Sequence, residues 1–148
     1  MGATAGPGSR ATGKDALGFA AGQVVQEFGY DDDVDVRLRS AIVAATGSEL
    51  VDEDYGDVTD GAIMWWRQED GDVLDLTDLL VDAISALDNG GLIWVLTPKS
   101  GRAGHVQPRD VEEAARTAGL HATSAVTAAP DWSGIRLAAR RSASSARW

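Results

Sequence analysis

The stretch DLTDLLVDAISALDNGGLIWVLTPK, residues 75–99, decides the fold of this chain. Its first half, residues 75–87, repeats apolar residues at the spacing of one helical face. The Asn-Gly-Gly at 89–91 predicts the end of that helix. The run LIWVLT at 92–97 is continuously apolar, which is typical of a strand buried on both faces of a parallel sheet. A helix followed by such a strand predicts an α/β protein.

The same alternation of strands and helices extends to both sides of this stretch. Strands that alternate with helices pair in parallel through right-handed crossovers. The short Ala-Ala-Pro-Asp turn before the last strand predicts an antiparallel hairpin instead. The sequence therefore predicts a three-layer, Rossmann-like α/β fold with a mostly parallel sheet and a C-terminal antiparallel hairpin. The predicted strands are 23–28, a brief 49–51, 61–67, 92–97, 121–127 and 132–138, and the other helices are 33–46 and 109–118.

The length of 148 residues suits one domain, which we expect to span residues 15–140. Residues 1–14 are rich in Gly, Ala, Ser, Thr and Pro, and residues 141–148 form a short basic end, so both are predicted to be disordered tails. The absence of cysteine excludes disulfides and thiolate metal sites. No apolar run is long enough for a membrane span or a signal peptide, so we expect a cytoplasmic protein that does not bind membranes.

Charge is distributed unevenly along the chain. Residues 15–88 hold 19 acidic and three basic residues, whereas residues 89–148 hold four acidic and eight basic residues. Because nucleic-acid affinity depends largely on Lys and Arg contacts to phosphate, the acidic front half predicts no nucleic-acid binding. The aspartates at 31–35 and 52–54 lack the spacing of a calcium-binding loop, and helix capping explains the first group. We therefore expect no metal.

Six segments of the chain carry a resemblance to a known family, namely GQVVQEFGYDDDVD (22–35), GSELVDEDY (47–55), WWR (65–67), GGLIWVLTPK (90–99), GHVQPRD (104–110) and DWSGIRL (131–137). In these segments the chain resembles the DUF3052 family, which is common in actinobacteria and brings no established activity. In addition, residues 61–140 resemble the C-terminal half of S-adenosylmethionine-dependent methyltransferases, in which a helix ends in a Gly-Gly turn and leads into a central strand. This second resemblance implies a truncated methyltransferase-type sheet.

The loop after the first predicted strand departs from the methyltransferase pattern. That family places an acidic residue and several spaced glycines there, and the glycines let the backbone approach the cofactor closely. The corresponding residues 27–33 read EFGYDDD, so Gly29 matches while Tyr30 and three aspartates replace the later small residues. The chain is also one strand–helix unit short before Gly61. The sequence therefore predicts no cofactor, S-adenosylmethionine included.

Basic residues gather after the central strand, where ligands bind in open α/β sheets. Lys99, Arg102 and His105 lie in a Gly-containing loop, and Tyr30 follows the first strand. Together they are candidates for binding an anionic ligand, and the alternative is a solvated loop whose charges pair with nearby aspartates.

The adjacent tryptophans 65 and 66 should face opposite sides of the sheet, which favours a role in the core. The alternative is that Trp66 and Arg67 contact a partner. No catalytic set is predicted, because Ser133 lacks a nucleophile-elbow frame and a neighbouring base.

Two functional hypotheses follow from these observations. The first is a non-catalytic domain that binds or regulates a protein partner on a degenerate methyltransferase-like scaffold. The alternative is a binding protein or enzyme for an anionic or nucleotide-like small molecule, acting at the carboxyl ends of the strands.

Overall fold

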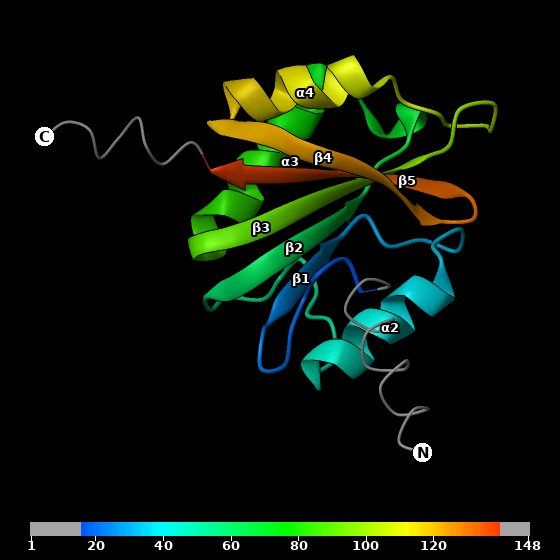
Figure 1. The fold of residues 1–148 in the computed structure, drawn as a ribbon. Coiled ribbons are helices and arrows are strands. Elements are labelled where there is room, and N and C mark those ends of the chain that lie inside the picture. Colours follow the sequence, from blue (N-terminus) through cyan, green and yellow to red (C-terminus); the bar gives the residue numbers. More distant parts are fainter. Residues whose placement is uncertain (1–15, 140–148) are drawn as a thin grey trace, which may run out of the picture.

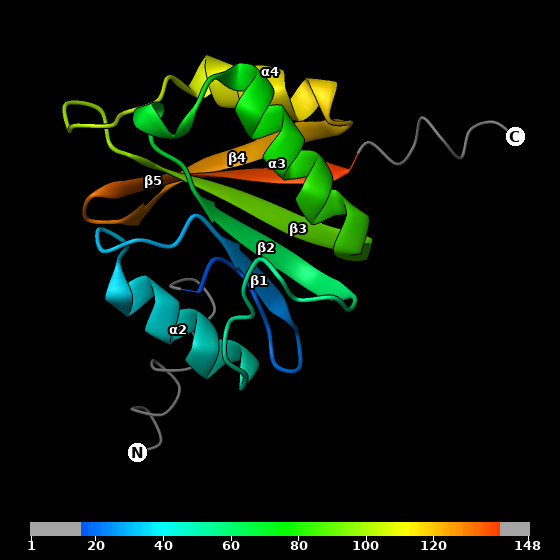
Figure 2. The same cartoon turned by 180° about the vertical axis from the view of Figure 1, so that it is seen from behind.

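Residues 16–139, which the computed structural model describes, form a five-stranded sheet with helices on both faces (Figure 1). The predicted tails at 1–14 and 141–148 lie outside the described residues. Helix α2 covers one face, and α3 and α4 cover the other (Figure 2), which confirms the three-layer prediction. The elements are β1 (Val25–Phe28), α2 (Val36–Thr46), β2 (Thr59–Trp65), a 3-10 turn (Gln68–Asp70), α3 (Val73–Ala86), β3 (Leu87–Pro98), α4 (Pro108–Thr117), β4 (Leu120–Ala129) and β5 (Trp132–Ala139).

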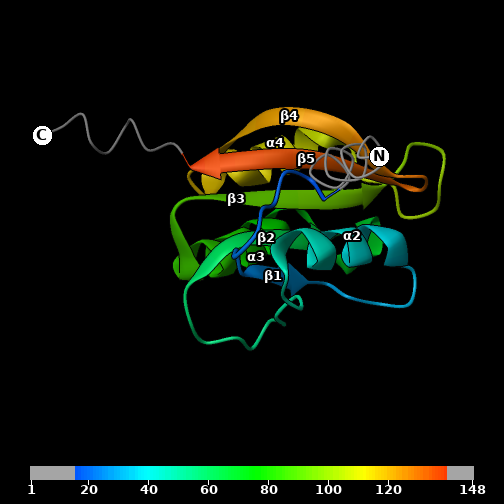
Figure 3. The same ribbon diagram turned by 60° about the horizontal axis from the view of Figure 1, so that its bottom comes forward.

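The strand order in the sheet is β1-β2-β3-β5-β4. Strands β1, β2 and β3 are parallel, whereas β5 runs antiparallel to both β3 and β4 (Figure 3). The predicted mostly parallel sheet with a C-terminal antiparallel hairpin is therefore confirmed. As a result, the carboxyl ends of the three parallel strands lie together at one edge of the molecule.

The connection between α3 and β3 differs from the prediction. Helix α3 ends at Ala86 and β3 begins at Leu87, so the glycine pair lies inside the strand and the predicted turn at 89–91 is wrong. The β2–β3 register shifts in this region, where a Cβ on Gly91 would lie 2.7 Å from the carbonyl oxygen of Asp60. Gly91 therefore serves a close approach between two strands rather than a helix stop.

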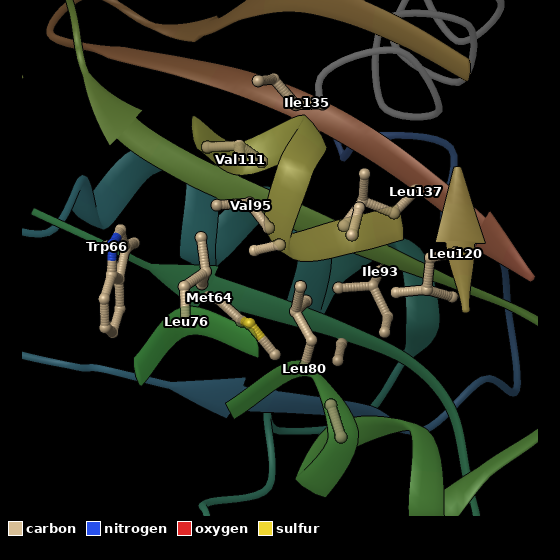
Figure 4. Close-up of a cluster of buried hydrophobic side chains, with 14 of the residues drawn as sticks. Met64, Trp66, Leu76, Leu80, Ile93, Val95, Val111, Leu120, Ile135 and Leu137 are labelled. Carbon is tan, nitrogen blue, oxygen red and sulfur yellow. The ribbon is translucent and has the colours of Figure 1, made fainter. Parts of the chain in front are cut away.

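The core lies on both faces of the sheet. Between the sheet and helices α3 and α4, buried side chains such as Met64, Leu80 and Ile93 form one cluster (Figure 4). The cluster on the α2 face includes Trp65, and Trp66 belongs to the opposite cluster. The prediction that the adjacent indoles face opposite sides is confirmed.

Two edge segments support the α2 face and β1. Residues before β1 enter the core, because Leu17 and Phe19 are buried and the carbonyl of Leu17 accepts a 3.0 Å hydrogen bond from the Trp94 indole. The predicted strand 49–51 is reduced to a single parallel bridge between Val51 and Gln26 on the outer edge of β1. The sequence did not indicate that Leu17 and Phe19, which precede β1, enter the core.

Candidate functional site

The carboxyl ends of β1 and β2 mark the point where the chain changes direction across the sheet. From β1 the chain passes through α2 to Val51 on the outer side of β1, and then returns to form β2 on the inner side. In open α/β sheets, ligands bind in the crevice at such a reversal. The carboxyl ends of β1 and β2 are therefore the expected position of a ligand site in this fold.

The side chain of Arg67 lies at this reversal, between the loop after β1 and the end of β2. Arg67 lies two residues beyond the end of β2 and is only 6% exposed. Its Nη1 donates hydrogen bonds to the carbonyls of Gly29 at 2.8 Å and Trp65 at 3.0 Å, and its Nε donates to Asp33 Oδ2 at 3.0 Å. A further ion pair joins Nη1 to Asp70 at 3.2 Å. The guanidinium thus ties the loop after β1 to the end of β2.

The charges in this cluster stabilise one another. The hydrogen bond from Arg67 lowers the pKa of Asp33 below its ordinary value. Burial by itself would lower the pKa of Arg67, but hydrogen bonds to Asp33 and Asp70 outweigh it and raise that pKa. One cation paired with two carboxylates leaves no surplus positive charge for an anionic ligand.

Other contacts hold the loop after β1 in the same closed arrangement. The Trp132 indole donates to the carbonyl of Asp33 at 3.2 Å and packs edge-to-face on Trp65 with ring centroids 4.9 Å apart. The backbone N–H of Gly29 donates to the Glu53 carboxylate at 2.9 Å. The loop is therefore held at its first residue, Gly29, and again at Asp33.

The structure does not bring the four predicted ligand residues to one site. Tyr30 is 59% exposed and lies 4.8 Å from the guanidinium of Arg39, to which its ring is a cation–π partner. Arg102 pairs with Asp131 at 3.1 Å, as the alternative of a solvated loop predicts.

His105 and Lys99 complete the predicted set. The Nδ1–H of His105 donates to the carbonyl of Pro98 at 2.9 Å, and this histidine lines two cavities. Lys99, Tyr30 and Arg102 line neither of those two cavities.

The structure places Trp66 and Arg67, the predicted partner-contact residues, in the interior with 7% and 6% of their surfaces exposed. Sequence reasoning missed the partners of Arg67, namely Asp33 and Trp132. A signal was present, because Arg67 is the one basic residue between positions 40 and 98, and a lone cation among acids must find partners if buried.

Replacing Asp33 with asparagine is expected to reduce the amount by which the free energy of unfolding falls at acid pH. Because the pKa of Asp33 is lower in the folded chain, its contribution is complete above the ordinary value of 3.8 and is lost as pH falls through the folded-state value. Urea unfolding of the wild type should therefore lose more stability between about pH 5 and pH 2 than unfolding of Asp33→Asn. Equal losses in the two proteins would contradict the Arg67–Asp33 pairing.

The described part of the chain contains neither a cluster of metal-ligating side chains nor a helix suited to span a membrane. Within residues 16–139, no three His, Asp or Glu side chains come close enough together to hold a metal ion. None of the helices in that range has the length and apolar character needed to cross a membrane.

Comparison with known sequences identifies relatives without an assigned activity. A family model described as "Protein of unknown function (DUF3052)" matches residues 14–141. Uncharacterised proteins of Mycobacterium bovis and Mycobacterium tuberculosis are 50% identical to this chain over 121 residues, covering 82% of this chain and 74% of each relative.

Comparison with solved structures shows a methyltransferase-like fold. The pyocyanin biosynthetic protein PhzM superimposes with a TM-score of 0.65 and 14% identity, over 86% of this chain and 53% of PhzM. Magnesium protoporphyrin IX methyltransferase (ChlM) from Synechocystis PCC 6803, solved with bound SAM, superimposes with a TM-score of 0.58 and 11% sequence identity. The match covers 88% of this chain and 79% of ChlM. The CcbJ methyltransferase from Streptomyces caelestis superimposes with a TM-score of 0.57 and 12% sequence identity. The match covers 90% of this chain and 95% of CcbJ. At these identities the likeness concerns the fold alone.

Proposed function

This chain belongs to the DUF3052 family, and we propose that it is a non-catalytic domain that binds a protein partner on a methyltransferase-like scaffold. The observation that carries the proposal is the Arg67 side chain in the crevice between β1 and β2. Four protein groups already use its donors, namely the carbonyls of Gly29 and Trp65 and the carboxylates of Asp33 and Asp70. A cofactor in this crevice would have to displace a buried, paired cation, which is strongly unfavourable.

Strand β4 supports the partner-binding part of the proposal. It forms one end of the sheet, and no strand among residues 16–139 pairs with its outer edge (Figure 1). Residues 121–127 are exposed in succession, and Leu120–Ala129 contains no Asp, Glu, Lys or Arg. Unprotected edge strands accept extended segments of other chains by backbone hydrogen bonding. The occupant that fits is an uncharged extended segment of a partner protein.

The other edge of the sheet is less suited to such a partner. Val51 already bonds to β1 on both sides of Gln26, since its N–H donates to the Val25 carbonyl at 3.0 Å and its carbonyl accepts from Glu27 at 2.8 Å. The surrounding residues 49–54 contain four acidic side chains. The β4 edge is therefore the better surface for strand addition.

The non-catalytic part is tested by calorimetric titration of the full chain with S-adenosylmethionine and S-adenosylhomocysteine. We expect no saturable heat at ligand concentrations up to about 1 mM, which corresponds to a binding free energy weaker than about −4 kcal/mol. Saturable binding tighter than this limit would contradict the closed crevice.

The partner-binding part is tested by affinity capture from native lysate with two matched variants. Val126 lies on β4 and is 41% exposed, whereas Val58 precedes β2 and is 57% exposed. Wild type and Val58→Lys should recover the same partner in a near-stoichiometric amount, and Val126→Lys should lose it, because a charge on the edge strand opposes strand pairing. Failure to recover any stoichiometric partner, or unchanged capture by Val126→Lys, would contradict the proposal.

A further inference from the structure

A cavity of about 320 Å³ lies on the opposite side of the sheet from Arg67, at the same carboxyl edge. The chain stays extended for two residues beyond β2, so Arg67 points to the side of the loop after β1 while its neighbour Trp66 lines this cavity. Leu76 and Val106 supply apolar lining. The N-terminal ends of α3 and α4 border the space, and the Gln68 N–H donates to the Gly104 carbonyl at 2.9 Å beside it.

Trp66 presents an unused hydrogen-bond donor here. Its side chain is more than nine-tenths buried and lies at one end of the apolar cluster (Figure 4). Its indole N–H donates to no group among residues 16–139, although the indoles of Trp65, Trp94 and Trp132 all donate to protein acceptors. The indole nitrogen itself is not enclosed, because Gln26 Oε1 is the one fully buried side-chain polar atom among residues 16–139 that lacks a hydrogen-bond partner. The Trp66 N–H therefore opens onto the cavity that this residue lines, where a ligand can supply its acceptor.

His105 contributes an acceptor to the same cavity. Its Nδ1–H donates to the carbonyl of Pro98, which can only accept, and the neutral ring therefore keeps its lone pair on Nε2. A histidine held in one tautomer by its own backbone contact offers the other nitrogen to whatever fills the adjacent space. The ligand must therefore supply a donor as well as an acceptor.

Asp72 and Asp110 add two carboxylates to the lining. Neither forms an ion pair with any residue from 16 to 139. The backbone N–H of Asp75 lowers the pKa of Asp72, so this carboxylate stays ionised. Phosphates and carboxylates would be repelled by this lining. The side-chain amides of Gln68 and Gln107 can donate or accept and so suit either role.

We propose that this Trp66 cavity binds an uncharged, polyhydroxylated molecule of about monosaccharide size. A hydroxyl group both donates and accepts, so one such molecule can satisfy the Trp66 N–H, the His105 Nε2 and the two carboxylates together. The cavity volume falls at the lower end of the range for small-molecule sites. An alkyl diamine such as putrescine would supply donors but no acceptor for the indole, and an anion would oppose the carboxylates. This inference is independent of the partner-binding proposal, which concerns another surface.

The test follows the indole N–H signal of Trp66 by NMR in the full chain. Glucose, galactose, ribose and myo-inositol are the probes, with glucose 6-phosphate and putrescine as charged comparators. We expect one of the uncharged probes to shift the Trp66 signal with a dissociation constant on the order of 1 mM. Sequential backbone assignment identifies that signal among the five tryptophans without a variant.

Matched variants then separate binding from folding. Asp110→Asn is nearly isosteric and should weaken the binding about tenfold, because it removes one charge-assisted acceptor. Asp78→Asn, on the exposed side of α3 and outside the cavity, should leave it unchanged. A Trp66 signal that no uncharged probe moves, or that only a charged comparator moves, would overturn the proposal. Equal affinity in Asp110→Asn and wild type would also overturn it.

Discussion

Replacing Arg67 with alanine is expected to lower the free energy of unfolding by about 2–4 kcal/mol. The substitution removes a buried cation that bonds to the carbonyls of Gly29 and Trp65 and to Asp33. The two carbonyls would lose a donor inside the protein, and the carboxylates would lose their counter-charge. Exposure of Asp33 and Asp70, at 53% and 33%, lets water compensate part of this loss and keeps the estimate below that for a fully buried pair. Urea unfolding measures the effect.

The control for this prediction is Arg102→Ala. Arg102 and Asp131 form an ion pair with both side chains more than half exposed, so its loss should change stability by no more than about 0.5 kcal/mol. Arg67→Lys should recover only part of the loss, since a lysine lacks the planar fork that reaches a carboxylate and two carbonyls together. A loss below about 1 kcal/mol in Arg67→Ala would show that the guanidinium is not what holds the crevice closed.

Much of the fold was predictable from local patterns. The run at 92–97 and the short turn before Trp132 specify strand type and pairing direction through features only a few residues long. The opposite orientation of Trp65 and Trp66 follows from strand geometry alone. These predictions succeeded because each depends on neighbouring residues.

The features that could not be predicted from the sequence depend on contacts between distant parts of the chain. From the local sequence, the glycine pair that includes Gly91 predicts the end of a helix. Only the position of the neighbouring strand β2 shows that Gly91 allows a close approach to the backbone of Asp60. The Arg67–Asp33 pair joins positions 34 residues apart, and Trp132 reaches Asp33 across 99 residues. The departure of residues 27–33 from the methyltransferase pattern is visible in the sequence itself. The contacts of Arg67 with that loop could be found only in the folded chain.

Replacing Gly29 with alanine is expected to destabilise the chain by about 3 kcal/mol or more. Gly29 has a φ of 75°, which disfavours any side chain, and a Cβ there would collide with the carbonyl oxygen of Trp65. That carbonyl cannot move aside without breaking its bond to Arg67, and it belongs to the last residue of β2. Chemical denaturation of the variant measures the loss.

Gly47→Ala supplies the matched control, because Gly47 has a φ of 83° at the end of α2 and open space around its missing side chain. It should lose only about 1 kcal/mol, the cost of the backbone conformation alone. The difference between the two variants therefore isolates the close approach of Gly29 to Trp65. Gly29 is the one glycine that matches the methyltransferase loop, where such a residue lets backbone approach a cofactor. A difference of about 2 kcal/mol or more would mean that this chain uses the same freedom to bring its own β2 strand against the loop. Equal losses would mean that the loop can move away from β2, and the crevice would then be open to a ligand after all.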